Sequence, residues 1–178
     1  MKKDTLRKIG MASLNWLYEN EEIKRGKEQL IRQQLYLDPL WDKAQTIGIV
    51  KALPFEFDTG PVMDQAWTED RRVVVPKTEV SGLVFHQVLP ESIYTRSSFG
   101  VEEPAQANEV ALSEIDLLIV PGLVFTLEGY RIGFGGGYYD RILQGYHGAH
   151  CSLVFSEQIQ ECWQPEPFDQ SIGRLFIH

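Results

Sequence analysis

Residues 115–141 decide the fold and read I-D-L-L-I-V-P-G-L-V-F-T-L-E-G-Y-R-I-G-F-G-G-G-Y-Y-D-R. The first six residues predict a buried strand, and a long loop, a tight glycine turn and a short helix follow. Six of the fifteen glycines lie between Gly122 and Gly137. Glycine allows positive φ angles and lets main-chain N–H groups approach a ligand, and a helix N-terminus behind such a turn suits phosphate. The turn is therefore a candidate anion site, with a purely structural strand-to-helix turn as the alternative.

Four residues in the same stretch favour a functional site, namely Arg131, Tyr138, Tyr139 and Asp140. The common nucleotide-binding motifs do not fit the stretch. A P-loop needs Lys-Ser or Lys-Thr after its glycines, and a dinucleotide fingerprint needs a third glycine where this chain has Tyr138. The residues by themselves thus predict an anion cradle and leave its ligand open.

The bulk composition narrows the class of protein. The chain has 178 residues, a net charge of −8, 43% hydrophobic residues and 24% charged residues, which is ordinary for one globular domain spanning residues 1–178. The acidic balance argues against a nucleic-acid binder, and no apolar run approaches the roughly 20 residues of a membrane span. Cys151 and Cys162 form no C-x-x-C pair, and no signal peptide is visible at the N-terminus. We expect a monomeric cytoplasmic protein whose partner is a small molecule.

Apolar, β-branched runs alternate with helical patterns along the chain. Helices are predicted over 2–37, with a break at Asn20, and over 61–70; strands are predicted over 46–50, 72–76, 83–88, 115–120, 152–155 and 174–177, the last at an edge. Asp38-Pro39 predicts a turn, and residues 91–108 predict an irregular connection. The alternation predicts an α/β fold, a three-layer sandwich with a mostly parallel sheet and helices on both faces.

The loop Leu53–Gly60 follows the first predicted strand, and ligands bind at such strand ends in open α/β sheets. Glu56 and Asp58 are candidate site carboxylates in this loop. Asp58 or Thr59 could instead simply cap the next helix, whereas Glu56 has no such structural role.

Basic residues lie in two further places of interest. Lys77 stands at the predicted end of the strand 72–76. Lys3 and Arg7 are four residues apart and share one face of the first helix, which on spacing alone predicts a solvated basic face.

The glycine stretch resembles the signature of the 5-formyltetrahydrofolate cyclo-ligases, also called methenyltetrahydrofolate synthetases, which is close to P-G-x-x-F-D…G-x-R-L-G-x-G-x-G-Y-Y-D. Further blocks along the whole chain are similar to the family: Lys3-x-x-x-Arg7, Leu53-Pro54-x-Glu56-x-Asp58-Thr59, Val75-Pro76-Lys77, Gly100-Val101-x-Glu103-Pro104, Phe155-x-Glu157-Gln158 and Pro167-Phe168-Asp169. Two positions depart from the family pattern, because Thr126 stands where aspartate is usual and Phe168 where histidine is common.

The resemblance implies a NagB/RpiA/CoA-transferase-like fold and a ligase that depends on ATP and Mg²⁺. Its substrate would be 5-formyltetrahydrofolate, and its products 5,10-methenyltetrahydrofolate, ADP and phosphate. Transfer of the γ-phosphoryl group to the formyl oxygen would let N10 attack, so that the protein mainly positions reactants and neutralises charge. The alternatives are a diverged paralogue with another ATP-dependent step and a non-catalytic nucleotide- or folate-binding module.

The resemblance also assigns roles to residues. Lys3, Arg131 and Asp140 would be catalytic, and Mg²⁺ would bind Asp140 and Asp169. The ATP-binding set would comprise Lys3, Arg7, Lys77, Arg131, Ile132, Gly133, Phe134, Gly135, Gly136, Gly137, Tyr138 and Tyr139. The pterin ring of the folate would donate hydrogen bonds to Glu56, and the folate would be flanked by the aromatic residues Phe99, Phe134, Tyr138 and Tyr139.

Overall fold

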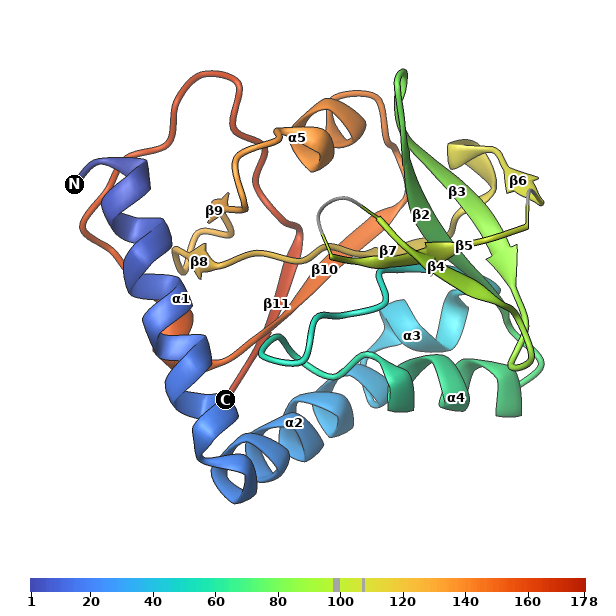
Figure 1. The fold of residues 1–178 in the computed structure, drawn as a ribbon, viewed down its shortest axis with the longest axis horizontal. Coiled ribbons are helices and arrows are strands. Elements are labelled where there is room, and N and C mark those ends of the chain that lie inside the picture. The colour runs from blue at the N-terminus through green and yellow to red at the C-terminus, as the bar shows by residue number, and fades with distance from the viewer. Residues whose placement is uncertain (98–99, 107) are drawn as a thin grey trace.

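The computed structural model describes residues 1–97, 100–106 and 108–178. A seven-stranded sheet runs through the molecule in Figure 1. From edge to edge its strands are β11 (Arg174–Ile177), β10 (Ala149–Val154), β7 (Leu117–Ile119), β1 (Thr46–Ile49), β2 (Arg72–Glu79), β3 (Gly82–Val88) and β6 (Glu109–Val110). The first five are parallel to one another, and β3 and β6 run antiparallel to their neighbours. The mostly parallel sheet and the edge position of residues 174–177 are confirmed.

Alternate side chains of the central strands enter two separate cores. Ile47 and Val73 belong to the first core, whereas Val74 and Leu118 belong to the second. Strands that are apolar on both sides require cover on both faces of the sheet, because each face would otherwise expose a hydrophobic surface.

Helices cover the two faces unequally. The first core receives side chains from α1 (Lys3–Glu19), α2 (Glu21–Tyr36), α3 (Pro39–Lys43) and α4 (Gly60–Thr68), which lie along the left and lower sides of Figure 1. The second core is packed by the short helix α5 (Tyr138–Leu143) and by the 3₁₀ turn η1 (Leu112–Glu114). The predicted three layers are confirmed, with most of the helical mass on one side.

Asn20 separates α1 from α2, as predicted. Its main-chain N–H and its side-chain amide both donate to the carbonyl of Trp16, so Asn20 closes the end of α1 and offers no side-chain cap to α2. Among the described residues, no helix has both the length and the apolar character that would let it cross a membrane.

The turn predicted at Asp38-Pro39 lies at Leu37 and Asp38, and Pro39 then starts the helix α3, since Asp38 accepts a hydrogen bond from the N–H of Leu40 and caps it. Three other expectations about local structure are wrong. Residues 91–108 contain a ribbon of β4 (Tyr94–Arg96) and β5 (Glu102–Pro104), and the loop after β7 contains a hairpin of β8 (Val124–Phe125) and β9 (Arg131–Ile132). Finally, β2 continues through Pro76 to Glu79. The pairing of β2 with β1 ends at Val74, so the missing N–H of Pro76 interrupts no hydrogen bond between β2 and β1.

α1 packs closely against the segment that leads into β8. A Cβ atom on Gly10 would lie 2.5 Å from the carbonyl oxygen of Leu123 and 2.8 Å from a methyl group of Val124. Glycine at this helix position therefore sets the distance between α1 and the β8–β9 hairpin, and with it the reach of the side chains at the N-terminus of α1.

We expect Gly10→Ala to lower the free energy of unfolding by about 1–3 kcal/mol, because the added methyl group overlaps main-chain atoms. Gly26→Ala on α2 is the matched control, since in the described part of the chain nothing beyond its own helix backbone and chain neighbours lies within 4 Å of the added carbon. The control should raise the free energy of unfolding by about 0.5–1 kcal/mol through helix propensity. Urea denaturation measures both changes, and equal stabilisation by the two variants would contradict the tight contact of α1.

Candidate active site

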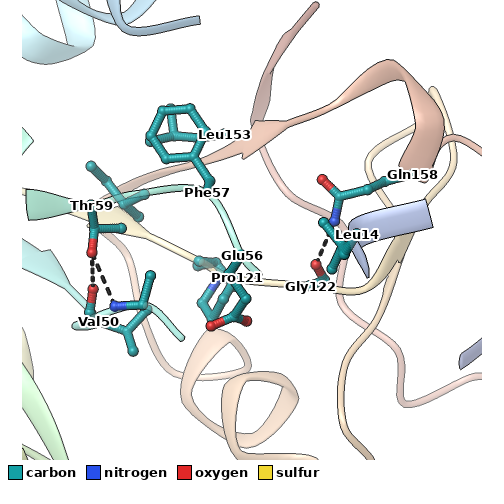
Figure 2. A pocket seen from close by; sticks show the side chains of 12 residues that line it. Leu14, Val50, Glu56, Phe57, Thr59, Pro121, Gly122, Leu153 and Gln158 are labelled. Carbon is teal, nitrogen blue, oxygen red and sulfur yellow. Dashed lines mark hydrogen bonds between the residues drawn. The ribbon is translucent and has the colours of Figure 1, made fainter. Parts of the chain in front are cut away.

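Loops at the carboxyl ends of three neighbouring strands meet at one small cavity, shown in Figure 2. Val50 follows β1, Pro121 and Gly122 follow β7, and Leu153 comes from β10. The cavity has a volume of about 40 Å³, which is room for roughly one water molecule. Its lining consists of Leu14, Val50, Ala52, Glu56, Phe57, Thr59, Ile119, Val120, Pro121, Gly122, Leu153 and Gln158. This is the edge of the sheet at which ligands bind in open α/β folds.

Glu56 is the charged residue in this lining, and it is buried. Its carboxylate accepts a hydrogen bond from the N–H of Leu53 (2.8 Å), and its own N–H donates to the Leu53 carbonyl (2.9 Å). The expectation that Glu56 has no structural role is therefore wrong, because Glu56 closes its own turn. Burial raises the pKa of Glu56, while the Leu53 N–H and the charge of Lys24 oppose the rise. A buried carboxyl group with a perturbed pKa at a strand end is typical of a functional site.

Asp58 and Thr59 hold the same loop in place. Asp58 accepts a hydrogen bond from the N–H of Gly60 (3.0 Å). The Thr59 hydroxyl donates to the Val50 carbonyl (2.8 Å) and accepts from the N–H of Ala52 (3.1 Å), as the dashed lines of Figure 2 indicate. Thr59 precedes α4 without a side-chain cap bond. Both residues thus have a structural role in the loop that carries Glu56.

The glycine turn connects β9 to α5. Gly135 and Gly137 have φ angles of 109° and 64°, which residues with a Cβ rarely adopt. A Cβ at Gly136 would lie 2.6 Å from the ring of Tyr138. The turn therefore needs glycine at three consecutive positions for its own geometry. Because α5 has only six residues, an anion here would depend on the N–H groups of the turn and on nearby cations more than on a helix dipole.

Arg7 of α1 is one of these cations. Its Nε donates a hydrogen bond to the carbonyl of Gly133 (3.0 Å), and its guanidinium lies 3.5 Å from where a Cβ of Gly135 would be. Arg7 also pairs with Asp4 one turn earlier in the helix. The solvated basic face that spacing alone predicts is wrong for this residue, since Arg7 lies along the glycine turn.

Lys3 faces the loop that precedes β11. Its ammonium group is 2.6 Å from Glu166 and 2.8 Å from Asp169, and it lies 5.1 Å from the centre of the Phe168 ring. Burial lowers the pKa of Lys3, but the hydrogen bonds to Asp169 and Glu166 outweigh burial and raise it. The N-terminus of α1 is thus joined to the loop before β11 by an ion-pair network, one helical turn from Arg7.

Arg131 is buried and links the turn to α5. Its Nη1 donates to Asp140 (2.9 Å) and to the carbonyl of Gln170 (3.3 Å), and the N–H of Gln170 donates to the same Asp140 oxygen (3.2 Å). The Tyr139 ring lies 5.9 Å from the Arg131 guanidinium. Burial raises the pKa of Tyr139; the charge of Arg131 opposes this rise and the charge of Glu56 adds to it. Tyr139 therefore packs beside the Arg131 guanidinium in the first turn of α5, directly after the glycine turn.

The remaining residues that were predicted to bind ATP or folate are less clearly part of the site. Lys77 lies inside β2, where it pairs with Val84, and not after the strand end as expected. The Ile132 side chain packs in the first core. Phe134 is exposed, 6.5 Å from the Phe55 ring, and Tyr138 carries the Arg141 guanidinium over its ring. Phe99 lies outside the described residues.

The predicted metal ligands differ in their capacity to bind an ion. Both oxygens of Asp169 accept hydrogen bonds, from Lys3 and from the N–H of Glu166. Asp140 uses only Oδ1 in the hydrogen bonds of the described residues. No three Asp, Glu, His or Cys side chains come together there as a ready metal site. Because Mg²⁺ is commonly bound by one or two carboxylates plus substrate phosphates, Asp140 fits this ion better than Asp169.

Sequence reasoning missed several residues that the structure brings to the site. Phe55 faces Phe134, Glu166 shares Lys3 with Asp169, and Gln170 bonds to both partners of the Arg131–Asp140 pair. A signal existed only for Glu166, which lies in the charged, proline-flanked run beside Asp169. The others form contacts that no local spacing encodes.

A parallel sheet that carries such a cation-lined glycine turn at its carboxyl edge is typical of α/β proteins that bind anionic small molecules. Residues 1–175 match the model of the 5-formyltetrahydrofolate cyclo-ligase family, and the chain belongs to that family.

Individual relatives agree with this membership. The chain is 29% identical over 165 residues to 5-formyltetrahydrofolate cyclo-ligase of Escherichia coli (strain K12), covering 85% of this chain and 90% of the relative. It is 30% identical over 144 residues to the Haemophilus influenzae enzyme of the same name, covering 74% and 77%. The solved structure of Aquifex aeolicus 5,10-methenyltetrahydrofolate synthetase superimposes with a TM-score of 0.83 at 28% identity, covering 99% of this chain and 90% of that one.

We expect Arg131→Met to lower the free energy of unfolding by about 2–4 kcal/mol, because Asp140 is left partly buried without its cation. Arg131→Met/Asp140→Asn should recover part of this loss, since the two effects are coupled. Arg25→Met is the control, because its ion pair with Glu21 is exposed, and it should leave stability unchanged. Thermal and urea denaturation measure all three. Additive losses in the double variant would contradict a direct interaction.

Proposed function

We propose that this protein is a ligase that uses ATP to close the ring of 5-formyltetrahydrofolate, forming 5,10-methenyltetrahydrofolate, ADP and phosphate. The observation that carries the proposal is that the Phe55–Phe134 ring pair joins the loop of the buried Glu56 carboxyl group to the glycine turn along which Arg7 lies. Family membership supports the same reaction, since the relatives described above are named for it.

The reaction needs activation because a formyl group on N5 is a poor electrophile whose oxygen is a poor leaving group. Transfer of the γ-phosphoryl group to the formyl oxygen gives an iminium phosphate and ADP. N10 then attacks the formyl carbon and loses its proton, and the former formyl oxygen departs with phosphate. No covalent protein nucleophile is needed, so the protein contributes position and charge.

The residues of the chain take complementary parts in this chemistry. Arg7 and the N–H groups of Gly135 to Gly137 hold the triphosphate, with Lys3 available once a phosphate competes with its carboxylate partners. Glu56 accepts hydrogen bonds from the pterin ring through its remaining acceptor capacity. Arg131 keeps Asp140 and α5 in place.

Asp140 is the residue that would hold Mg²⁺, which when bound neutralises phosphate charge. The assignment of Asp169 as a second ligand is weaker, because Lys3 and the Glu166 N–H occupy both of its oxygens. Contacts of ATP with Lys77 and Ile132, the monomeric state and the cytoplasmic location stay predictions.

A folate ring does not fit the cavity as it stands, because the volume is about 40 Å³. The tilted pair of Phe55 and Phe134 connects the Glu56 loop to the glycine turn, and Phe134 is exposed. We infer that separation of these two rings opens the space between Glu56 and Tyr139 for the pterin ring.

The reaction is tested by mixing the protein with 5-formyltetrahydrofolate, Mg²⁺ and ATP and following methenyltetrahydrofolate absorbance. Asp140→Asn should lower kcat by about 100-fold or more, because charge on the phosphates is no longer balanced. Asp64→Asn, an exposed carboxylate on α4, is the control and should match the wild type. Folded wild-type protein without an ATP-dependent signal would favour the binding-module alternative, and a fully active Asp140→Asn would refute the metal assignment.

Glu56→Gln should have opposite effects on binding and on stability. The Michaelis constant for the folate should rise about 10- to 100-fold, since charged hydrogen bonds to the pterin are lost. A carboxyl group whose pKa is raised on folding stabilises the fold below its unfolded pKa and loses that contribution as pH rises through the folded pKa. Glu56→Gln should therefore raise the Tm at pH 7.5 but not at pH 4. A Tm gain of equal size at both pH values would contradict this account.

A further inference from the structure

A buried ion pair on α2 lies behind the loop that carries Glu56. Lys24 Nζ is 2.7 Å from Glu28 Oε1, one helical turn further on, and the two residues are only 7% and 4% exposed. Lysine and glutamate are rarely buried this completely, and the desolvation of two charges is only partly offset by their attraction. Two apolar residues would pack against the core equally well, so stability of the fold does not explain why this position holds an ion pair.

The pair is tied directly to the loop. Glu28 Oε1, the same oxygen that accepts from Lys24, also accepts a hydrogen bond from the N–H of Asp58 (2.9 Å). Asp58 stands two residues after Glu56. Together with the Leu53 and Thr59 hydrogen bonds, this contact fixes the loop on both sides of the Glu56 carboxyl group.

Lys24 is also the cation whose charge acts on Glu56. Its attraction opposes the rise that burial imposes on the pKa of Glu56. Around Glu56, α1 and β10 contribute the apolar Leu14 and Leu153, and η2 (Ser156–Gln158) contributes the neutral Gln158. The other charged or titratable groups around this loop are Asp58 in the loop, Tyr139 on α5, and two residues of α2: Glu28, which bonds to Asp58, and Arg32, whose guanidinium lies 5.9 Å from the centre of the Phe57 ring.

A second lysine on α2 forms an ion pair whose role is only structural. Lys27 Nζ is 3.0 Å from both Glu157 and the Ser156 hydroxyl, and it fastens α2 to η2. Its side chain is 18% exposed, against 9% for Lys24, and it makes no bond to the loop 53–59 among the described residues. Lys27 therefore provides a matched control on the same helix.

We propose that Lys24 and Glu28 are positioning residues for Glu56: Lys24 holds the Glu28 carboxylate, and Glu28 holds the loop through the Asp58 N–H, so that the pair presents the Glu56 side chain to its ligand. This rests on the proposed function, in which Glu56 accepts hydrogen bonds from the pterin ring. The pair acts on the folate and not on ATP, because among the described residues its side chains bond to the loop of Glu56 and not to the glycine turn.

The experiment compares Lys24→Met, Glu28→Gln and Lys27→Met with the wild type. For Lys24→Met we expect a roughly 10-fold rise in the Michaelis constant for 5-formyltetrahydrofolate, a Michaelis constant for ATP within about twofold, and an acid limb of kcat/KM moved to higher pH. Glu28→Gln keeps an acceptor for Asp58 and leaves Lys24 uncompensated, so its acid limb should move to lower pH. Lys27→Met should change only the stability of the fold, and it should leave both Michaelis constants and the acid limb at their wild-type values.

A readout without folate separates this inference from the proposed function. The titration of Glu56 can be followed by NMR in protein labelled with ¹³C at the glutamate carboxyl carbon, with Glu56→Gln to assign the signal. Glu56 should titrate at higher pH in Lys24→Met and at lower pH in Glu28→Gln, whether or not the protein turns over folate. If Lys24→Met does not fold, the titration of Glu56 in Glu28→Gln tests the inference by itself. Titration of Glu56 at the wild-type pH in the folded variants would overturn the inference, whereas a wild type without ligase activity would refute only the proposed function.

Discussion

The close contact of Gly10 with the main chain at Leu123 is the constraint on which the rest of the site depends. It holds α1 against the β8–β9 hairpin at a distance that a methyl group would already disturb. From that position Arg7 reaches the Gly133 carbonyl, 126 residues away, and Lys3 reaches Asp169, 166 residues away. Closing the chain over such separations costs conformational entropy. Burial of apolar side chains beneath α1 offsets this cost, since Leu6, Leu14 and Leu17 are fully buried.

Charge around the site is neutralised in pairs. Lys3 pairs with Glu166 and Asp169, Arg131 pairs with Asp140, and Lys24 pairs with Glu28. An acidic protein can thus keep a set of cations at one edge of its sheet without large repulsion between them. An anionic ligand would exchange with the carboxylates of the more exposed pairs, such as Lys3 with Glu166, whereas the buried pairs keep their geometry and hold the loops.

Much of the fold was predictable because it is encoded locally. The β-branched runs became the central strands, and the break at Asn20 and the glycine turn lie where the residues indicate. Expectations failed where a distant partner decides the outcome. Pro76 stays inside β2 because β1 has already ended beside it, and the ribbon of β4 and β5 forms in a stretch with no clear pattern. Likewise Glu56 proved to bond to Leu53, and Lys77 lies within a strand.

The sequence by itself determined the fold class, the glycine turn and the family, since hydrophobic period, glycine spacing and motif order are properties of neighbouring residues. It also named Lys3, Arg7, Arg131 and Asp140 as members of one site, through the resemblance. Only the tertiary structure decided their partners. Within the described residues one oxygen of Asp140 accepts no hydrogen bond whereas both oxygens of Asp169 do, and the Lys24–Glu28 pair holds the loop of Glu56 through the Asp58 N–H. Those contacts join residues far apart in the chain, and their existence depends on how helices pack on the sheet, which local spacing does not encode.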